Sequence, residues 1–300
     1  MTTIPDFSKV NPSPFNLDNS DAYRQWRDHK LAARPPGLEA IIVEIEDLNR
    51  LNESEKSALS ACLRDCNMAI YASKQPRPNE KSEIRNLGRE FSLERLDHNM
   101  GADDEGITEL EVKNDAAHKR YIPYTNRAIH WHTDGYYNTP GQSIHGMVLH
   151  CVEPAVKGGE NALLDHELAY IHLRDINPDY IKALMQVDAF TIPANIVDGK
   201  TLRPDRSCPV FSLDNENNLY MRFTERKHNI IWKDDPVLSA AVKALVTLLH
   251  SDSPYIYRGT LQTGQGLICN NVLHDRSGFE DDKNHTRLLY RLRYYDRIKV

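Results

Sequence analysis

Two short stretches that lie far apart in the chain carry the residue types of a metal centre. His132 and Asp134 stand two positions apart in Ile129-His-Trp-His-Thr-Asp-Gly135, and His274 follows a late apolar run. Two imidazoles and one carboxylate can occupy one face of an octahedral ferrous ion and leave three positions open. This mixture of nitrogen and oxygen ligands suits Fe(II) better than Mg²⁺ or Ca²⁺, which prefer oxygen alone. The pattern therefore predicts a mononuclear iron site.

The spacing of these residues indicates how strands would present them. Residues i and i+2 of a β-strand point to the same face, so His132 and Asp134 are expected side by side on one wall. Gly135 lets the chain turn, which places Asp134 at the end of its strand. The stretch 266–273 before His274 is typical of an apolar strand running into a polar turn. A His-x-Asp motif alone is weak evidence, because it arises by chance in many proteins.

The last predicted strand, residues 286–295, carries a row of arginines. Alternation puts Arg287, Arg291 and Arg293 on one face with Leu289, whereas the opposite face is apolar and aromatic. If the arginine face lines a barrel interior, its guanidiniums lose their hydration, which is costly without an anion. A dicarboxylate ligand would resolve that conflict through bidentate pairing. The alternative is an edge strand whose arginines are solvated.

Four motifs in this order resemble the Fe(II)/2-oxoglutarate-dependent dioxygenases of the taurine dioxygenase (TauD/TfdA) group. They are Trp131-His132-x-Asp134, the turn Gly158-Gly159-Glu160-Asn161, the later His274, and Arg287-x-x-x-Arg291. Trp131 matches the usual Trp-His-x-Asp of the group, and the turn resembles its Gly-Gly-acidic-Thr turn. The resemblance covers the chain from about residue 38 to the C-terminus.

The resemblance implies a double-stranded β-helix that holds Fe(II) by His132, Asp134 and His274. The cosubstrate 2-oxoglutarate would chelate the iron, and its C5 carboxylate would pair with Arg287. Asn161 stands where the family has a threonine that binds the same carboxylate, and an asparagine amide can donate that hydrogen bond. The implied reaction consumes O2, releases succinate and CO2, and hydroxylates or desaturates a substrate. The presence of Asp134 disfavours halogenation.

The resemblance also points to a substrate class. In this family, an arginine four residues after the one that binds 2-oxoglutarate, as Arg291 is after Arg287, often binds the acid group of the substrate. The implied partner is therefore a small anionic or zwitterionic metabolite, such as a carboxylate, a sulfonate or an amino acid. Tyr136 and Tyr137, just past the metal-binding motif, and Arg222 are further candidates for substrate contact.

Two alternatives stay open at this point. His130, His132 and Asp134 all fall on one strand face, so a cupin-type metal dioxygenase could use both histidines without any cosubstrate. Arg287 and the Gly-Gly turn would then have no role. A non-catalytic relative could instead bind a metabolite without turnover.

Composition excludes several other classes of protein. The chain has 300 residues, of which 40% are hydrophobic and 27% charged, which is ordinary for a globular protein. A formal net charge of −6 argues against nucleic-acid binding, which needs a basic surface. No signal peptide and no long apolar run are evident, so we expect no membrane contact. Five cysteines without metal-type spacing favour a cytoplasmic protein, and homo-oligomerisation is left open.

The pattern of predicted elements is mainly β with flanking helices (α+β), typical of a jelly roll. We expect a single catalytic domain over residues 1–300. Residues 1–37 would form an N-terminal arm and a helix over 21–33 capped by Ser20, and residues 38–300 the core with helical inserts. The irregular segment 74–128 reads as a lid or loop with one weak helix near 80–96. Strands are expected at 38–45, 67–72, 129–134, 143–152, 161–164, 188–192, 209–213, 218–223, 255–260, 266–270 and 286–295.

Two helices have clear start signals. Asn52 and Glu55 have the spacing of a capping box, which predicts a helix that runs to about Cys66. Asp235 and Pro236 are typical of an N-cap and a first helical position, before a run with apolar residues on one face.

Overall fold

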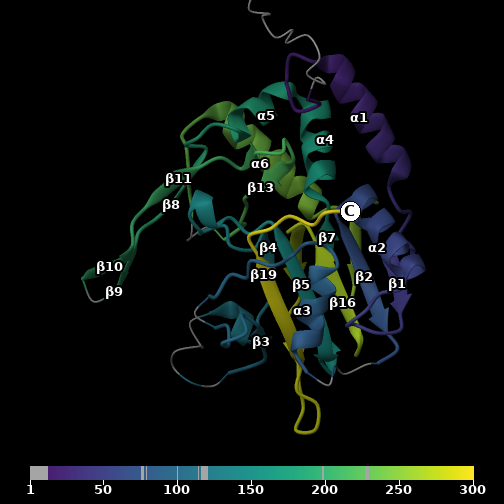
Figure 1. Ribbon diagram of the computed structural model, residues 1–300. Helices are drawn as coiled ribbons and strands as arrows, with labels where there is room; N and C mark the ends of the chain where they lie inside the picture. Colours follow the sequence, from purple (N-terminus) through teal and green to yellow (C-terminus); the bar gives the residue numbers. More distant parts are fainter. Residues whose placement is uncertain are drawn as a thin grey trace, which may run out of the picture.

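Two β-sheets face each other, and helices cover their outer faces (Figure 1). The computed structural model describes residues 13–300 except 76–77, 79, 100, 114, 116–120, 198 and 227–229. The larger sheet has the strand order β1-β2-β16-β5-β19-β3, and the smaller has the order β15-β7-β17-β4. This arrangement is the predicted jelly-roll core with flanking helices. The first twelve residues of the expected N-terminal arm lie outside the described residues.

The larger sheet is built around a strand that is buried on both faces. Its strands are β1 (Ile42–Ile45), β2 (Met68–Ser73), β16 (Gln265–Cys269), β5 (Gly146–Glu153), β19 (Leu288–Tyr294) and β3 (Thr108–Leu110). β1 and β2 are parallel, and the other neighbours are antiparallel. β5 is buried from Gly146 to Val152, so its near-continuous apolar run reflects a central position.

The smaller sheet carries the metal-binding motifs, and the two sheets enclose an apolar interior. Its strands are β15 (Ile256–Gly259), β7 (Asn161–Leu164), β17 (Leu273–Arg276) and β4 (Ile129–His132), all antiparallel. One core cluster fills the space between the sheets, with Ile70, Leu149 and Leu267 from the larger sheet and Leu163 and Tyr257 from the smaller.

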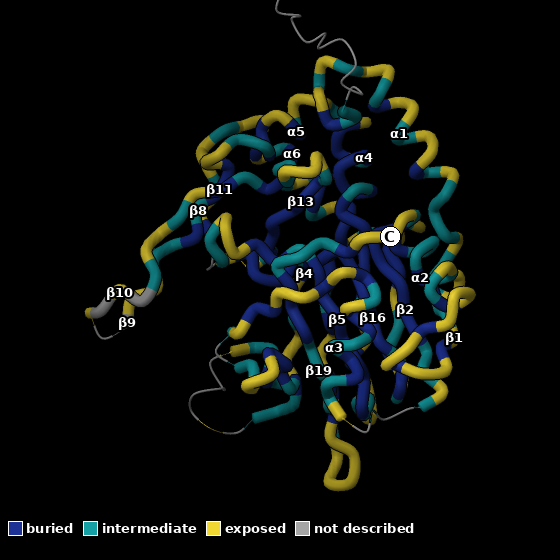
Figure 2. Tube along the Cα trace, viewed as in Figure 1, coloured by how far each residue is buried: buried dark blue, intermediate teal, exposed yellow. Residues whose placement is uncertain are grey.

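Helices close both outer faces. The larger sheet is covered by α2 (Glu53–Cys66) and α3 (Ser82–Arg89). The smaller sheet is covered by α1 (Ser20–Ala33), α4 (His166–Ile176), α5 (Pro178–Leu184) and α6 (Pro236–Leu249). The strands are accordingly buried, whereas the outward faces of the helices are exposed (Figure 2). None of the described helices combines the length and hydropathy that a membrane span requires.

Short strands and 3-10 turns lie outside the two main sheets. β9 (Asn195–Val197) and β10 (Lys200–Arg203) form a hairpin that extends away from the body of the molecule (Figure 1). The other short elements are η2 (Leu38–Ile41), η3 (Ile122–Tyr124), η4 (Pro140–Gln142), β6 (Lys157–Gly158), β8 (Phe190–Ile192), β11 (Arg206–Cys208), β12 (Phe211–Leu213), β13 (Leu219–Met221), β14 (Ile231–Trp232) and β18 (Phe279–Glu280).

The predicted helix starts are confirmed at two helices and corrected at a third. Asn52 and Glu55 form the full capping box of α2, and the Asp235 side chain caps α6 with Pro236 in its first turn. α1, however, begins at Ser20, and Asn19 is its cap because the Asn19 amide oxygen accepts from Ala22 N at 3.0 Å.

Three other expectations need correction. The stretch 38–45 is a 3-10 turn over Leu38–Ile41 followed by a strand of only four residues. The weak helix near 80–96 is limited to Ser82–Arg89. The apolar strand and the turn expected before His274 are present, but the strand β17, which carries His274 in the smaller sheet, was not predicted.

A buried charge network joins α1 to the core. Lys30 Nζ lies 2.8 Å from Asp165 Oδ2 and 2.5 Å from Glu167 Oε2. Asp165 is fully buried and also accepts from Asn67 Nδ2 at 3.0 Å. Burial by itself would raise the pKa of Asp165, but Lys30 and the neighbouring donors outweigh burial and hold that pKa below its usual range.

Lys30→Met should lower the free energy of unfolding by roughly 3–5 kcal/mol, because it leaves the Asp165 charge buried without its cation. Urea unfolding at pH 7 measures the loss. Because the folded-state pKa of Asp165 is depressed, its contribution is present above the unfolded pKa of about 4 and fades as pH falls below it. The difference between wild type and variant should therefore shrink below about pH 4.

The control for this variant is Lys56→Met, because Lys56 forms a more exposed pair with Glu90 at 2.8 Å. Surface pairs contribute about 0–1 kcal/mol, so this change should have little effect. Equal losses in both variants would contradict the special role of the buried network.

Candidate active site

Pairing of β4 with β17 brings the three predicted metal ligands together. His132 lies directly opposite His274 in the antiparallel register, and their ring centroids are 4.2 Å apart. His132 Nε2 lies 3.5 Å from Asp134 Oδ1. The ligand atoms of His132, Asp134 and His274 all lie within 4.8 Å of one another, and no other such group occurs among the described residues.

Hydrogen bonds orient both imidazoles for metal binding. His132 Nδ1 is 2.9 Å from His130 O, and His274 Nδ1 is 2.9 Å from Val272 O. A carbonyl only accepts, so each Nδ1 carries the hydrogen and each Nε2 keeps a free lone pair. Asp134 Oδ2 is buried without a hydrogen-bond partner among the described residues. This donor set fits a divalent metal ion of the Fe(II) type.

The protonation states also fit a metal site. Burial lowers the pKa of His274 to about 4, and His132 acts in the same direction. Burial alone would raise the pKa of Asp134, but the Arg291 and Arg293 guanidiniums outweigh it and hold the pKa well below its usual range. At neutral pH, Asp134 is therefore ionised and His274 neutral, the states that metal ligands require.

Arg287, directly before β19, is a buried cation that forms no ion pair with a described residue. It is 5% exposed, and its guanidinium carbon lies 5.0 Å from the Phe279 ring centroid. Among the described residues, no carboxylate forms an ion pair with this guanidinium. Burial lowers the pKa of Arg287, and Cys151 and Asp281 only partly oppose that effect. An anionic ligand would relieve this cost.

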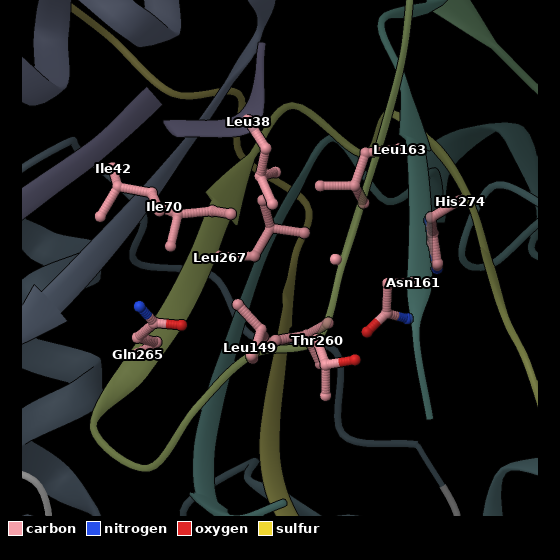
Figure 3. A pocket seen from close by; sticks show the side chains of 12 residues that line it. Leu38, Ile42, Ile70, Leu149, Asn161, Leu163, Thr260, Gln265, Leu267 and His274 are labelled. Atoms are coloured by element: carbon pink, nitrogen blue, oxygen red, sulfur yellow. The ribbon is translucent and has the colours of Figure 1, made fainter. Parts of the chain in front are cut away.

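Asn161 and His274 share the wall of a small apolar cavity between the sheets (Figure 3). The Asn161 amide donates to Asp275 O at 2.7 Å, which leaves its second amide hydrogen for a ligand. The Gly-Gly turn before Asn161 is tight: Gly158 and Gly159 have φ values of 76° and 73°, and a Cβ on Gly158 would lie 2.3 Å from Gly278 O.

The other two arginines of the row are paired with carboxylates. Arg291 Nη1 lies 3.3 Å from Asp134 Oδ2. Arg293 forms an ion pair with Asp97 and donates to Tyr137 Oη at 3.2 Å. Asp97 was missed by sequence reasoning because it lies in the irregular segment, where no periodicity or motif marks it.

The remaining predicted substrate residues differ in their contacts. Tyr137 is 39% exposed, and its ring makes an edge-to-face contact with that of Tyr136 at 5.2 Å. Arg222 is buried and donates to Tyr136 O at 3.0 Å, to Asn138 O at 2.6 Å and to Ser143 Oγ at 3.1 Å. These contacts indicate that Arg222 supports the loop after β4. Its contact with the substrate stays a prediction.

His130 does not join the three ligands. Its side chain is exposed and lines a separate hollow of about 150 Å³, with Asp275 from β17 and His250 at the end of α6. Only its carbonyl reaches the metal site, as the acceptor of the His132 hydrogen bond. The His-x-His-x-Asp reading that would suit a cupin-type site therefore has no support in the geometry.

Comparison with known proteins agrees with this site. The family model described as Taurine catabolism dioxygenase TauD, TfdA family matches residues 30–293. A uridine-5'-phosphate dioxygenase from an Amycolatopsis species is 28% identical over 173 residues, which span 55% of this chain and 60% of that protein. A protein of the same name from a Streptomyces species is 27% identical over 233 residues, or 71% of this chain and 81% of that protein.

A solved structure supports the fold. An asparagine oxygenase in complex with Fe(II), 3-hydroxyasparagine and succinate superposes with a TM-score of 0.58, although its sequence is only 12% identical. The match covers 96% of this chain and 86% of the oxygenase. Since the family model spans nearly the whole chain and the ligand set of the family is assembled in the structure, this protein belongs to the TauD/TfdA family of Fe(II)/2-oxoglutarate-dependent dioxygenases.

Proposed function

We propose that this chain hydroxylates or desaturates a small anionic or zwitterionic metabolite with Fe(II), 2-oxoglutarate and O2, and releases succinate and CO2. One observation carries the proposal: the facial ligand set occurs together with a buried Arg287 that has no ion-pair partner among the described residues. A divalent metal and a dianionic cosubstrate supply the charges that this interior lacks. In this proposal the chain forms one catalytic domain.

The three ligands would hold the ferrous ion through Nε2 of both histidines and Oδ1 of Asp134. When bound, the iron supplies O2 activation coupled to oxidative decarboxylation of 2-oxoglutarate. The carbonyls of His130 and Val272 keep the two Nε2 atoms unprotonated and directed at the metal. Arg291 balances the charge on Asp134 Oδ2, which keeps the carboxylate ionised.

Arg287 would bind the C5 carboxylate of the cosubstrate through its guanidinium. The support is its burial, the stacking on Phe279 and the absence of an ion pair among the described residues. The second amide hydrogen of Asn161 would donate to the bound acid, as the threonine of the family pattern does. Both residues would orient the cosubstrate and exclude water from its C5 carboxylate.

Arg291 is our candidate for the acid group of the substrate, and Tyr137 is the candidate for a second polar contact. Arg291 lies beside the metal ligand, and the Arg293–Asp97 pair holds the Tyr137 hydroxyl nearby. Both curated relatives are named for uridine 5'-phosphate. A phosphate monoester therefore joins the carboxylate, the sulfonate and the amino acid as a candidate substrate class.

A panel of these four acid classes, read out by succinate formation, tests the function. We expect succinate in the presence of Fe(II), 2-oxoglutarate, O2 and one substrate class, and none after chelation of the metal. O2 uptake without consumption of 2-oxoglutarate would favour a cosubstrate-free dioxygenase. Metabolite binding without either signal would favour a non-catalytic relative.

Arg287→Met should raise the KM for 2-oxoglutarate by about 30-fold or more and leave the KM for the substrate nearly unchanged. The reason is that loss of one partner from a buried charge pair costs about 2 kcal/mol or more. Steady-state succinate formation at varied 2-oxoglutarate measures it. Arg258→Met, at an exposed arginine of β15, is the matched control. An unchanged KM for 2-oxoglutarate would refute this role of Arg287.

Arg291→Ala should change the KM for the substrate and leave the KM for 2-oxoglutarate nearly unchanged. We expect a rise of about 30-fold or more in the KM for the acidic substrate, since the largely buried cation that would pair with it is removed. A metal titration of the same variant separates substrate loss from metal loss, because Arg291 also lies beside Asp134. If the KM for the substrate and the turnover were both unchanged, Arg291 would not contact the substrate.

A further inference from the structure

The metal-binding carboxylate lies just beyond the strand that carries it. β4 ends at His132, and β17 begins at Leu273. Extension of the register that pairs His132 with His274 would place Asp134 opposite Val272, but this pair makes no ladder contact. The main chain of Asp134 therefore lacks the β-ladder bonds that hold the two histidines.

The side chain of Asn271 occupies the place of that missing pair. Asp134 N donates to Asn271 Oδ1 at 2.8 Å, and Asn271 Nδ2 donates to Asp134 O at 3.0 Å. The carboxamide thus binds both polar groups of residue 134, as a backbone peptide would in an antiparallel ladder. Asn271 is 2% exposed, so these bonds form away from water.

The other sides of this peptide are held as well. Asn271 Nδ2 also donates to Ile144 O at 2.7 Å, which ties down the chain that follows the Gly135 turn. On the opposite edge, Thr133 N donates to Phe223 O at 3.0 Å, and Phe223 N donates to Thr133 Oγ1 at 3.1 Å. The Thr133–Asp134 segment is therefore held from both edges, and on the β17 side the Asn271 side chain makes the hydrogen bonds to Asp134.

The backbone of Asn271 explains why this residue type is used. Its φ of 47° lies in the left-handed region, which asparagine tolerates better than most residues. Aspartate lacks the two amide hydrogens, and glutamine is one methylene longer. Asparagine alone combines this backbone conformation with a donor and an acceptor at the correct reach.

We propose that Asn271 is a positioning residue that sets the metal affinity by holding the main chain of Asp134. The inference rests on the proposed function, because it assumes that Asp134 ligates the metal. His274 follows Asn271 by three positions. The turn between β16 and β17 therefore positions His274 and, through Asn271, also holds Asp134. The amide bonds to main-chain atoms of Asp134 and Ile144, so its effect on the metal would pass through Asp134.

The decisive variant is Asn271→Gly, which keeps the left-handed backbone and removes only the amide. Its matched control is Asn217→Gly, because Asn217 has a φ of 68° in an exposed turn between β12 and β13. The measurement is anaerobic calorimetric titration of the metal-free proteins with Fe(II) and with Co(II), at a temperature where each is folded. Metal affinity should fall about 10- to 100-fold in the first variant, the usual effect of losing a partner of a ligand.

Asn271→Asp is the second variant, because it keeps the acceptor for Asp134 N but loses both donated bonds. We expect a similar fall in metal affinity and an altered ligand-field absorption spectrum of the Co(II) form. Wild-type affinity and spectrum in both variants would overturn the inference, as would an equal loss in Asn217→Gly.

A wrong assignment of Asp134 as a metal ligand would give a different result from a wrong role for Asn271. Asp134→Ala serves as the reference, since removal of a ligand should abolish tight metal binding whatever holds the main chain. If Asp134→Ala bound metal as tightly as wild type, the ligand assignment itself would be wrong, and the role of Asn271 would fall with it. Loss in Asp134→Ala without loss in Asn271→Gly would refute the positioning role alone.

Discussion

The active site depends on the main-chain pairing that sets His132 opposite His274. Strand residues alternate between faces, so a slip of one residue would turn an imidazole away from the interior. The neighbours Trp131 and Leu273 prevent that slip, because both are buried in the core that the helices form against the outer face of the smaller sheet. The apolar packing outside the sheet therefore fixes the position of the ligands inside it.

The second constraint on the site is the burial of several arginine side chains close to one another. Arg291 and Arg293 lie in β19 and Arg287 directly precedes it, and each meets the cost of burial in a different way. Arg293 has a permanent partner in Asp97, and Arg291 is paired with the carboxylate of the metal site. Arg287 has no carboxylate partner among the described residues, and the cation is therefore free for a ligand. Three arginines close together in sequence therefore differ in whether a carboxylate among the described residues pairs with them.

Asparagines at turns connect the site to the helical layers. Asn270 donates to Asn67 Oδ1 at 2.9 Å, and Asn67 donates in turn to Asp165, the partner of Lys30 in α1. Asn271, the next residue along, holds Asp134. The turn between β16 and β17 thereby carries two adjacent polar side chains, one directed at the helical network and one at the metal site. Hydrogen bonds and the Lys30–Asp165 ion pair therefore link these buried polar groups into one internal network.

Much of the fold and of the site could be read from local patterns. The capping box at Asn52, the N-cap at Asp235 and the alternation along β19 depend on neighbours in sequence, so they were predictable. His132, Asp134 and His274 were identifiable because a facial ligand set needs specific residue types. Asp97, Asn271 and the structural role of Arg222 could not be found in this way, because each depends on partners distant in the chain.

The sequence by itself determined which chemistry this protein can carry, since residue types decide what can bind iron or neutralise an acid. Only the tertiary structure decided which charges are already satisfied. Arg287 and Arg291 look alike in sequence, yet one is unpaired among the described residues and the other lies 3.3 Å from Asp134. The difference arises because charge pairing in a buried interior depends on distances in space, and a linear pattern holds no information on those distances.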